Sequence, residues 1–268
     1  MTQYKALAID LDGTLLVGED LSVENRDAVR RAREAGYSIV IATARWRQMA
    51  MRVATEIGLS GPIIACSGAQ VYLPESSSDI FDHRLPDEFT NELYALCNAN
   101  RCIATVTVSE DVILKLDGEP DPALLSAEMT WVPQLDPLRH SKPRIAAIQG
   151  STLVNEIKSN LLPKWADQIN LYDSIGPNGK IVITITTKAA NKGHALRAAC
   201  EHLGINLNEV ISFGDAENDI EMFKVTGASV AMGQAEQFIK DAATTTTTNN
   251  TDHGVAVAIH KLLDEGQL

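Results

Sequence analysis

Short runs of consecutive apolar residues constrain the fold of this chain more than any other feature. They lie at residues 4–10, 37–44, 62–66, 209–215 and 228–232. Runs without alternation of apolar and polar residues are typical of strands buried on both faces, as in a parallel sheet covered by helices. Because segments with a helical pattern separate these runs, we predict an α/β fold with a doubly wound parallel-sheet, Rossmann-like core.

Two of the separating segments have clear helix boundaries. Residues 22–36 open with Ser22, a residue type that caps helix N-termini well, and stop at Gly36. Residues 191–204 follow the same pattern and stop at Gly204. In a fold of this kind, ligands bind outside the carboxyl ends of the strands.

The middle of the chain has a different pattern, with alternating strands that suit a half-buried sheet. The expected elements are a helix near 87–99, strands at 102–108 and 144–150, a helix near 151–166 and a hairpin over 169–187 that turns at Gly176-Pro177-Asn178-Gly179. We therefore predict an α+β domain at 83–187, inserted between the two parts of the core at 1–82 and 188–268.

Composition excludes several classes of protein. The 268 residues are 45% hydrophobic and 22% charged, as in an ordinary soluble globular protein. The net charge of -12 argues against a nucleic-acid partner, although a local pocket could still bind a small anion. No stretch reaches the roughly 18 uninterrupted apolar residues of a membrane span, and the N-terminus lacks a basic signal-peptide region. We expect a cytoplasmic protein with no membrane partner.

Three other features favour structural roles. The cysteines show no metal-ligand spacing and are expected to be structural thiols in a reducing cytosol: Cys66, Cys97, Cys102 and Cys200. The GPNGK stretch at 176–180 lacks the spacing of a phosphate-binding P-loop, so it is interpreted as a hairpin turn. The run Thr244–Thr248 is expected to form a strand.

The first apolar run ends in two carboxylates, in the stretch LAIDLDGTLL at residues 7–16. Asp10 and Asp12 are two residues apart, so in a strand both would face one side. A turn before Gly13 would explain Asp12, but it leaves Asp10, which has apolar neighbours, unexplained. Buried aspartates are rare unless they are paired or bind a cation, so we predict a functional site at this strand tip.

A third carboxylate follows another buried strand. The stretch 210–223 runs into Gly214-Asp215 and then Asn218-Asp219, where a capped helix start would need only one such residue. Two unit charges 4 Å apart repel by about 4 kcal/mol at an effective dielectric of about 20. Three converging carboxylates therefore require a cation, and oxygen ligands without His or Cys suit Mg²⁺.

Two further polar groups occupy comparable positions. The strand at 39–42 leads into Thr43-Ala44-Arg45, where a hydroxyl and backbone N–H groups precede a helix and could bind phosphate. Lys192 lies in the first turn of the expected helix at 191–204. By itself it would be a solvated lysine, but near a carboxylate cluster it would balance charge and hold a phosphoryl oxygen.

Four motifs in this order resemble those of the haloacid dehalogenase (HAD) superfamily of phosphatases, in the Cof-like subgroup with a type IIB inserted cap. They are D-x-D-G-T at 10–14, Thr43, Lys192 and G-D-x-x-N-D at 214–219. The insert of about a hundred residues between the second and third motifs is also similar to that subgroup, and the resemblance covers essentially the whole chain. It implies a Mg²⁺-dependent phosphomonoester hydrolase that acts on small phosphorylated metabolites, with substrate choice made by the cap.

The resemblance also implies a role for each matching residue. Asp10 would attack phosphorus to form an aspartyl-phosphate, and Asp12 would act as general acid and then general base. The side chains of Asp10 and Asp215 and the backbone carbonyl of Asp12 would hold Mg²⁺. The phosphate group would be bound by Thr43, the backbone at Ala44 and Arg45, Lys192 and Asn218, while Asp219 would orient Lys192 or the waters on the metal.

The chain departs from the family pattern at two positions. Ala44 replaces a glycine in the usual Thr-Gly-Arg and adds a methyl group beside the expected phosphate. Ser67 stands where an asparagine is common in the family.

Three other functions are compatible with parts of this pattern. A phosphomutase of the same superfamily would pass the phosphoryl group to a second hydroxyl, and product analysis would distinguish it. A receiver-type signalling domain uses a similar acidic cluster but is about half this length and lacks the insert. A non-catalytic binding protein would have no reason to retain Asp10, Asp12, Lys192 and Asp215.

Overall fold

The computed structural model describes residues 4–121, 125–175 and 179–265 and has an α/β fold. It divides into two compact units: Met1–Phe81 with Asn191–Leu268, and Asp82–Ala190. We call them the core and the insert.

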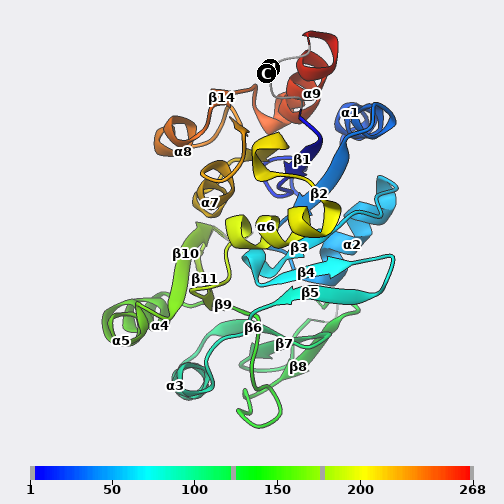
Figure 1. Cartoon of the computed structure of the whole chain (residues 1–268). Helices are drawn as coiled ribbons and strands as arrows, with labels where there is room; N and C mark the ends of the chain where they lie inside the picture. Colours follow the sequence, from blue (N-terminus) through cyan, green and yellow to red (C-terminus); the bar gives the residue numbers. More distant parts are fainter. Residues whose placement is uncertain (1–3, 122–124, 176–178, 266–268) are drawn as a thin grey trace. The chain divides into compact units, whose positions relative to one another are not determined.

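The core is built on one eight-stranded sheet (Figure 1). In spatial order its strands are β14 (Thr245–Thr246), β13 (Ala228–Ala231), β12 (Val210–Gly214), β1 (Ala6–Ile9), β2 (Ser38–Ala42), β3 (Ile63–Ala65), β4 (Gln70–Leu73) and β5 (Ser78–Asp82). The pairings from β14 to β3 are parallel, and β4 is antiparallel to β3. The doubly wound parallel core predicted from the five apolar runs is confirmed. Of the threonine run, only Thr245 and Thr246 form a strand.

Helices cover both faces of this sheet. They are α1 (Val23–Glu34), α2 (Arg47–Glu56), α6 (Lys192–Leu203), α7 (Ile220–Phe223), α8 (Gln237–Ala242) and α9 (Gly254–Glu265). On one face α6, α7 and α8 share a hydrophobic cluster with alternate side chains of the strands, among them Ala6, Ala8 and Val40. On the other face α1 packs against α9 (Figure 1). Both helices predicted from the sequence are confirmed. Ser22 caps the start of α1, where its Oγ accepts from Asn25 N, and Gly204 ends α6 in a left-handed conformation.

The parallel register brings three strand ends to one edge of the sheet. Ile9 of β1 is level with Phe213 of β12 on one side and with Ile41 of β2 on the other. Asp10, Thr43 and Asp215 follow these strands within one or two residues, so the backbone alone places them along the same edge.

The insert contains a six-stranded sheet with helices on one face. Its spatial order is β10 (Ile169–Ile175), β11 (Ile181–Thr187), β9 (Ile145–Gln149), β6 (Ile103–Val108), β7 (Asp111–Leu116) and β8 (Met129–Val132). The helices are α3 (Asp87–Ala99), α4 (Ser151–Glu156) and α5 (Leu162–Trp165). The helix expected near 151–166 is interrupted, because residues 157–161 form a π-helical turn. Strands β10 and β11 pair as the predicted hairpin, but Gly176, Pro177 and Asn178 of its turn lie outside the described residues.

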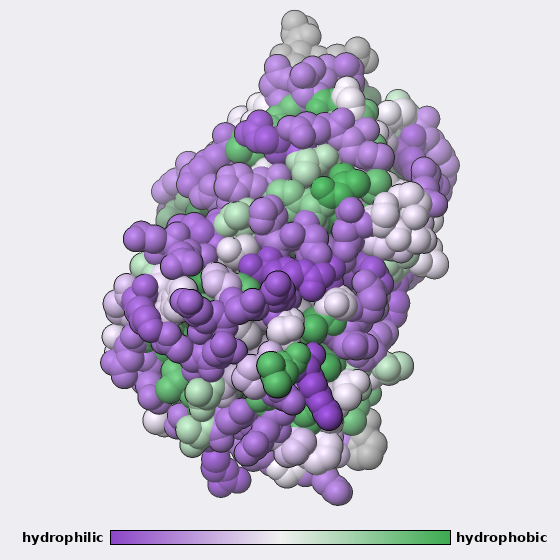
Figure 2. Space-filling model, turned by 60° about the horizontal axis from the view of Figure 1, so that its bottom comes forward, coloured by the Kyte–Doolittle hydropathy of each residue, from purple (hydrophilic) through white to green (hydrophobic). Residues whose placement is uncertain are grey.

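The surface in Figure 2 is mostly hydrophilic, and hydrophobic residues appear on it in small separate groups. Among the helices of the described residues, none is both long and apolar enough to cross a membrane.

Candidate active site

An acidic group lies at the carboxyl edge of the core sheet. Carboxylate oxygens of Asp10, Asp215 and Asp219 all lie within 4.8 Å of one another. Asp10 directly follows β1, Asp215 directly follows β12, and Asp219 ends the short helical turn at 217–219. Asp10 is 4% exposed and Asp219 is fully buried, so two of the three charges have almost no contact with water.

Lys192 joins two of these carboxylates. Its Nζ atom lies 2.6 Å from Asp10 Oδ1 and 2.6 Å from Asp219 Oδ1. Lys192 is the first residue of α6, and the Asn191 side chain caps that helix by accepting from His194 N. The cap fixes the first turn of α6, and the lysine side chain is thereby held inside the acidic group.

Burial sets the electrostatics of the group. Burial raises the pKa of Asp10 well above its ordinary value, Lys192 opposes this rise, and the charges of Asp219 and Asp215 add to it. Burial and the charge of Asp219 together raise the pKa of Asp215 to about 6. Burial alone would lower the pKa of Lys192, but the charges of Asp10 and Asp219 outweigh it and raise that pKa. One ammonium therefore does not fully compensate three carboxylates, and a further cation would favour their ionised forms.

Asp219 has both of its oxygens engaged within the protein. Oδ1 accepts from Lys192, and Oδ2 accepts from the backbone N–H groups of Asp215 and Ala216 at 3.0 and 3.1 Å. Its position therefore suits the orientation of Lys192 and of the loop that carries Asp215. Asp10 and Asp215 are left as the carboxylates best placed to bind a cation, and hard oxygen donors of this kind fit Mg²⁺.

Asp12 lies outside the acidic group, with its side chain on Arg45. Arg45 Nε lies 2.9 Å from Asp12 Oδ2, and a terminal nitrogen lies 2.6 Å from Asp12 Oδ1. The same guanidinium contacts Glu19 at 2.7 Å. Burial disfavours the charged guanidinium, but the hydrogen bonds and charges of Asp12 and Glu19 outweigh burial and raise the pKa of Arg45. The Arg45 side chain is 7% exposed and the Asp12 side chain is 53% exposed, so a buried cation holds a carboxylate that solvent can reach.

Some of the polar groups in the turn after β2 already have hydrogen-bond partners within the protein. Thr43 is fully buried, its N–H donates to Ile64 O, and its hydroxyl accepts from Arg45 N at 3.1 Å. The amide of Arg45, expected to bind phosphate, is therefore engaged inside the turn. The hydroxyl proton of Thr43 and the amide of Ala44 are the donors of this turn that suit an incoming anion.

Two glycines permit close packing in the site. Gly13 has a φ of 77°, and a Cβ atom there would lie 2.2 Å from Asp215 Oδ2. Gly68 has a φ of 89°, and a Cβ atom there would lie 2.2 Å from the carbonyl carbon of Asn191. The loop after β3 therefore packs directly against the first turn of α6, next to Lys192.

Two buried polar atoms beside these motifs have no partner within the described residues. They are Asn218 Oδ1 and Ser67 Oγ. Oxygen and nitrogen of an asparagine amide are assigned from their partners, so Asn218 offers either an acceptor or a donor. Unsatisfied buried polar atoms are costly, and a bound ligand or water would satisfy them.

Three residues of the site had no role in the sequence interpretation. Thr14 Oγ1 donates to Asp215 Oδ1 at 3.2 Å, and its place in the D-x-D-G-T motif was the available signal. Glu19 contacts Arg45, and Gln234 Nε2 donates to the Gly13 carbonyl. Nothing local in the sequence marks Glu19 or Gln234, because their partners are distant along the chain.

Comparisons with known proteins identify several that are similar to this chain. The family model of haloacid dehalogenase-like hydrolases matches residues 7–259. Phosphatase YwpJ of Bacillus subtilis is 28% identical to this chain, over 97% of this chain and 100% of that protein. A second B. subtilis protein, 5-amino-6-(5-phospho-D-ribitylamino)uracil phosphatase YcsE, is 29% identical over 95% and 94% of the two chains. A haloacid dehalogenase-like hydrolase from Bacteroides thetaiotaomicron superposes with a TM-score of 0.82 at 26% identity, over 97% of this chain and 100% of that one.

Proposed function

The chain belongs to the haloacid dehalogenase-like hydrolase family and is a phosphatase, and we propose that it hydrolyses phosphomonoesters of small metabolites through an aspartyl-phosphate on Asp10. The observation that carries this proposal is the position of Asp10, buried at a strand tip and bonded through one oxygen to Lys192.

Asp10 is the nucleophile in this mechanism. Lys192 holds Oδ1, which leaves Oδ2 to attack phosphorus while the bond between phosphorus and the leaving oxygen breaks. The ammonium of Lys192 also favours the ionised form of Asp10 against the effect of burial. Asp219 fixes Lys192 from the other side, so Lys192 can contact a phosphoryl oxygen without moving.

Asp12 transfers the protons. As the acid it gives a proton to the leaving oxygen, and as the carboxylate it then removes a proton from the water that attacks the aspartyl-phosphate. Arg45 holds Asp12 through two nitrogens and is itself held by Glu19, so the carboxylate has a fixed direction. We assign Arg45 to positioning Asp12 through its side chain.

The remaining polar groups bind the phosphoryl group and the cofactor. The hydroxyl of Thr43, the amide of Ala44 and the amide of Asn218 supply hydrogen bonds to phosphoryl oxygens. Asp10 and Asp215, with the backbone carbonyl of Asp12, would hold Mg²⁺. When bound, Mg²⁺ supplies positive charge that favours ionised carboxylates and stabilises the negative charge of the transferred group.

The substrate is proposed to be a phosphorylated sugar or a similar small metabolite, selected by the insert. The relative named for a phosphoribitylamino-uracil supports this class, since that compound joins a phosphate to a short polyol. The test is phosphate release from an aryl phosphate, a panel of sugar phosphates and the phosphoribitylamino-uracil, each with Mg²⁺ and with EDTA.

We expect Mg²⁺-dependent release in the wild type and none in Asp10→Asn, whose folding is checked by circular dichroism. Equal release by the folded Asp10→Asn variant would contradict the covalent mechanism. Disappearance of a sugar phosphate without free phosphate would instead show transfer to a second hydroxyl, as in a mutase.

A further inference from the structure

Two of the four cysteines lie together in the insert. Cys97 is in the last turn of α3 and is fully buried, and Cys102 directly precedes β6 and is 6% exposed. Cys102 Sγ donates to the carbonyl oxygen of Cys97 at 3.5 Å, and the two thiols also contact each other. The pair is separated by four residues, so a bond between the two sulfur atoms would close only a short loop.

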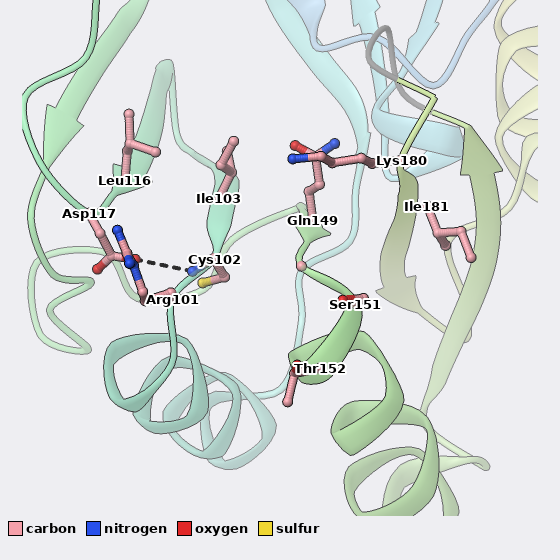
Figure 3. Close-up of a pocket in the computed structure, with 11 residues that line it drawn as sticks. Arg101, Cys102, Ile103, Leu116, Asp117, Gln149, Ser151, Thr152, Lys180 and Ile181 are labelled. Atoms are coloured by element: carbon pink, nitrogen blue, oxygen red, sulfur yellow. Dashed lines mark hydrogen bonds between the residues drawn. The ribbon is translucent and has the colours of Figure 1, made fainter.

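A buried ammonium lies against the Cys102 sulfur. Lys115 is 1% exposed, and its three protons face three acceptors: Asn100 O at 3.1 Å, Asp117 Oδ1 at 3.0 Å and Cys102 Sγ at 3.6 Å. Asp117 also accepts from Cys102 N at 3.1 Å (Figure 3). Lys115 and Asp117 thus hold the backbone and the sulfur of Cys102 at the same time, and a thiolate would provide a second negative charge beside the ammonium.

These contacts favour the thiolate form of Cys102. The hydrogen bond from the Cys97 thiol and the charge of Lys115 outweigh burial and lower the pKa of Cys102 to about 7. By contrast, burial in α6 raises the pKa of Cys200 to about 11. Because the thiolate is the nucleophilic form, Cys102 and Cys200 should differ widely in reactivity at neutral pH.

Cys102 lines a cavity of about 600 Å³. Arg101, Asp117, Gly150 and Ser151 line this cavity beside it. In Figure 3 the Cys102 sulfur lies on one wall, next to Arg101 and Asp117, and Ser151 lies on the opposite wall. Cys97 is fully buried and does not line this cavity, so the cavity brings a small oxidant to Cys102 rather than to Cys97.

We propose that Cys102 is a peroxide-reactive thiol and that Cys97 converts its oxidised form into a Cys97–Cys102 disulfide. In the first step the Cys102 thiolate attacks one oxygen of a hydroperoxide; the O–O bond breaks, and sulfenic acid and hydroxide, or alkoxide, are formed. In the second step the Cys97 thiol gives up its proton and attacks the sulfenic sulfur; the S–O bond breaks and water leaves. The sulfur atoms together lose two electrons and the hydroperoxide gains them.

Mass spectrometry of the full-length protein tests this chemistry independently of phosphatase activity. The reduced wild type, treated with hydrogen peroxide, is expected to lose two hydrogen atoms, and the unreduced digest should contain a linked Cys97–Cys102 peptide. Cys97→Ala should stop at a sulfenic acid on Cys102 that dimedone traps. Cys102→Ala should give neither product, while Cys200 serves as the internal unreactive control.

The pH dependence of iodoacetamide labelling tests the role of Lys115. In the wild type, labelling of Cys102 should be half-maximal near pH 7, and Lys115→Met should slow it roughly tenfold at that pH. Asp117→Asn removes a negative charge that disfavours the Cys102 thiolate, so this variant should not label more slowly than the wild type. A midpoint above about 8.5 in the wild type, the value of an ordinary thiol, would overturn the proposal. Failure of peroxide to link Cys97 to Cys102 would overturn it equally.

Discussion

Lys192 determines the charge balance of the site, because its ammonium contacts two buried carboxylates. Lys192→Met leaves Asp10 and Asp219 buried without that counter-charge, so we expect the free energy of unfolding to fall by about 3–5 kcal/mol. Urea unfolding in EDTA measures this change.

The matched control is the double variant Lys192→Met with Asp219→Asn. An asparagine oxygen can still accept from the Asp215 and Ala216 amides, and one buried charge is removed. The double variant should therefore regain part of the lost stability while remaining inactive. A Lys192→Met protein as stable as the wild type would show that the carboxylates are compensated in another way.

Asp215 gives the metal-free protein a defined pH dependence. Its folded-state pKa of about 6 exceeds the ordinary value of about 3.9, so between these pH values the folded state binds more protons than the unfolded state. This contribution is greatest below about pH 4, and raising the pH through 6 removes up to about 3 kcal/mol. Urea unfolding in EDTA across this range should show a steeper loss for wild type than for Asp215→Asn. Parallel curves would contradict the raised pKa.

Arg45 is proposed to hold the Asp12 side chain in position and not to react with the substrate itself. Arg45→Lys keeps the charge but loses the paired contact with Asp12, so kcat should fall by roughly ten- to a hundredfold. Steady-state kinetics would show the loss mainly in kcat. A change confined to KM would place Arg45 in substrate binding instead.

Among the structural elements, the loop after β3 and the first turn of α6 depend on each other. Gly68→Ala would force a Cβ atom into the backbone of Asn191, whereas Gly36→Ala, with a φ of 97°, meets nothing within 4 Å. Both substitutions carry the strain of a positive φ, about 1 kcal/mol. Gly68→Ala should cost about 1–3 kcal/mol more and reduce activity through Lys192, as thermal unfolding and phosphate release would show. Equal effects of the two substitutions would contradict this coupling.

Much of the core is predictable from the sequence, because β1, β2, β3, β12 and β13 are continuous apolar runs and because α1 and α6 begin with side-chain caps. Strands β4 and β5 were not predicted: β5 is largely exposed and has no apolar run to mark it. For the threonine run at 244–248 the predicted strand was too long. β propensity favours a strand over all five threonines, but only the two residues of β14 pair with β13.

The candidate site was predictable where a motif is local, as for Asp10 and Asp215. The contacts of Arg45 with Asp12 and Glu19 were not, because they join segments more than twenty residues apart through side chains alone. The assignments of individual residues to catalysis stay predictions until they are tested.

At the scale of the whole molecule, the insert has a hydrophobic core of its own, centred on Phe89, Leu93 and Trp165. Asp82–Ala190 should therefore fold without the rest of the chain and unfold cooperatively. Thermal unfolding of this segment, followed by circular dichroism, checks the expectation. A gradual, non-cooperative loss of signal would show that the insert depends on the core.

The most direct test of the account is to trap the phosphorylated enzyme in Asp12→Asn with an aryl phosphate. A good leaving group needs little acid catalysis, whereas hydrolysis of the intermediate needs the base that this variant lacks. After acid quenching, peptide mapping should place phosphate on Asp10, with none on the Asp10→Asn/Asp12→Asn protein. Phosphate on a different residue, or no phosphorylated peptide while Asp12→Asn still releases the aryl alcohol, would contradict the aspartyl-phosphate mechanism.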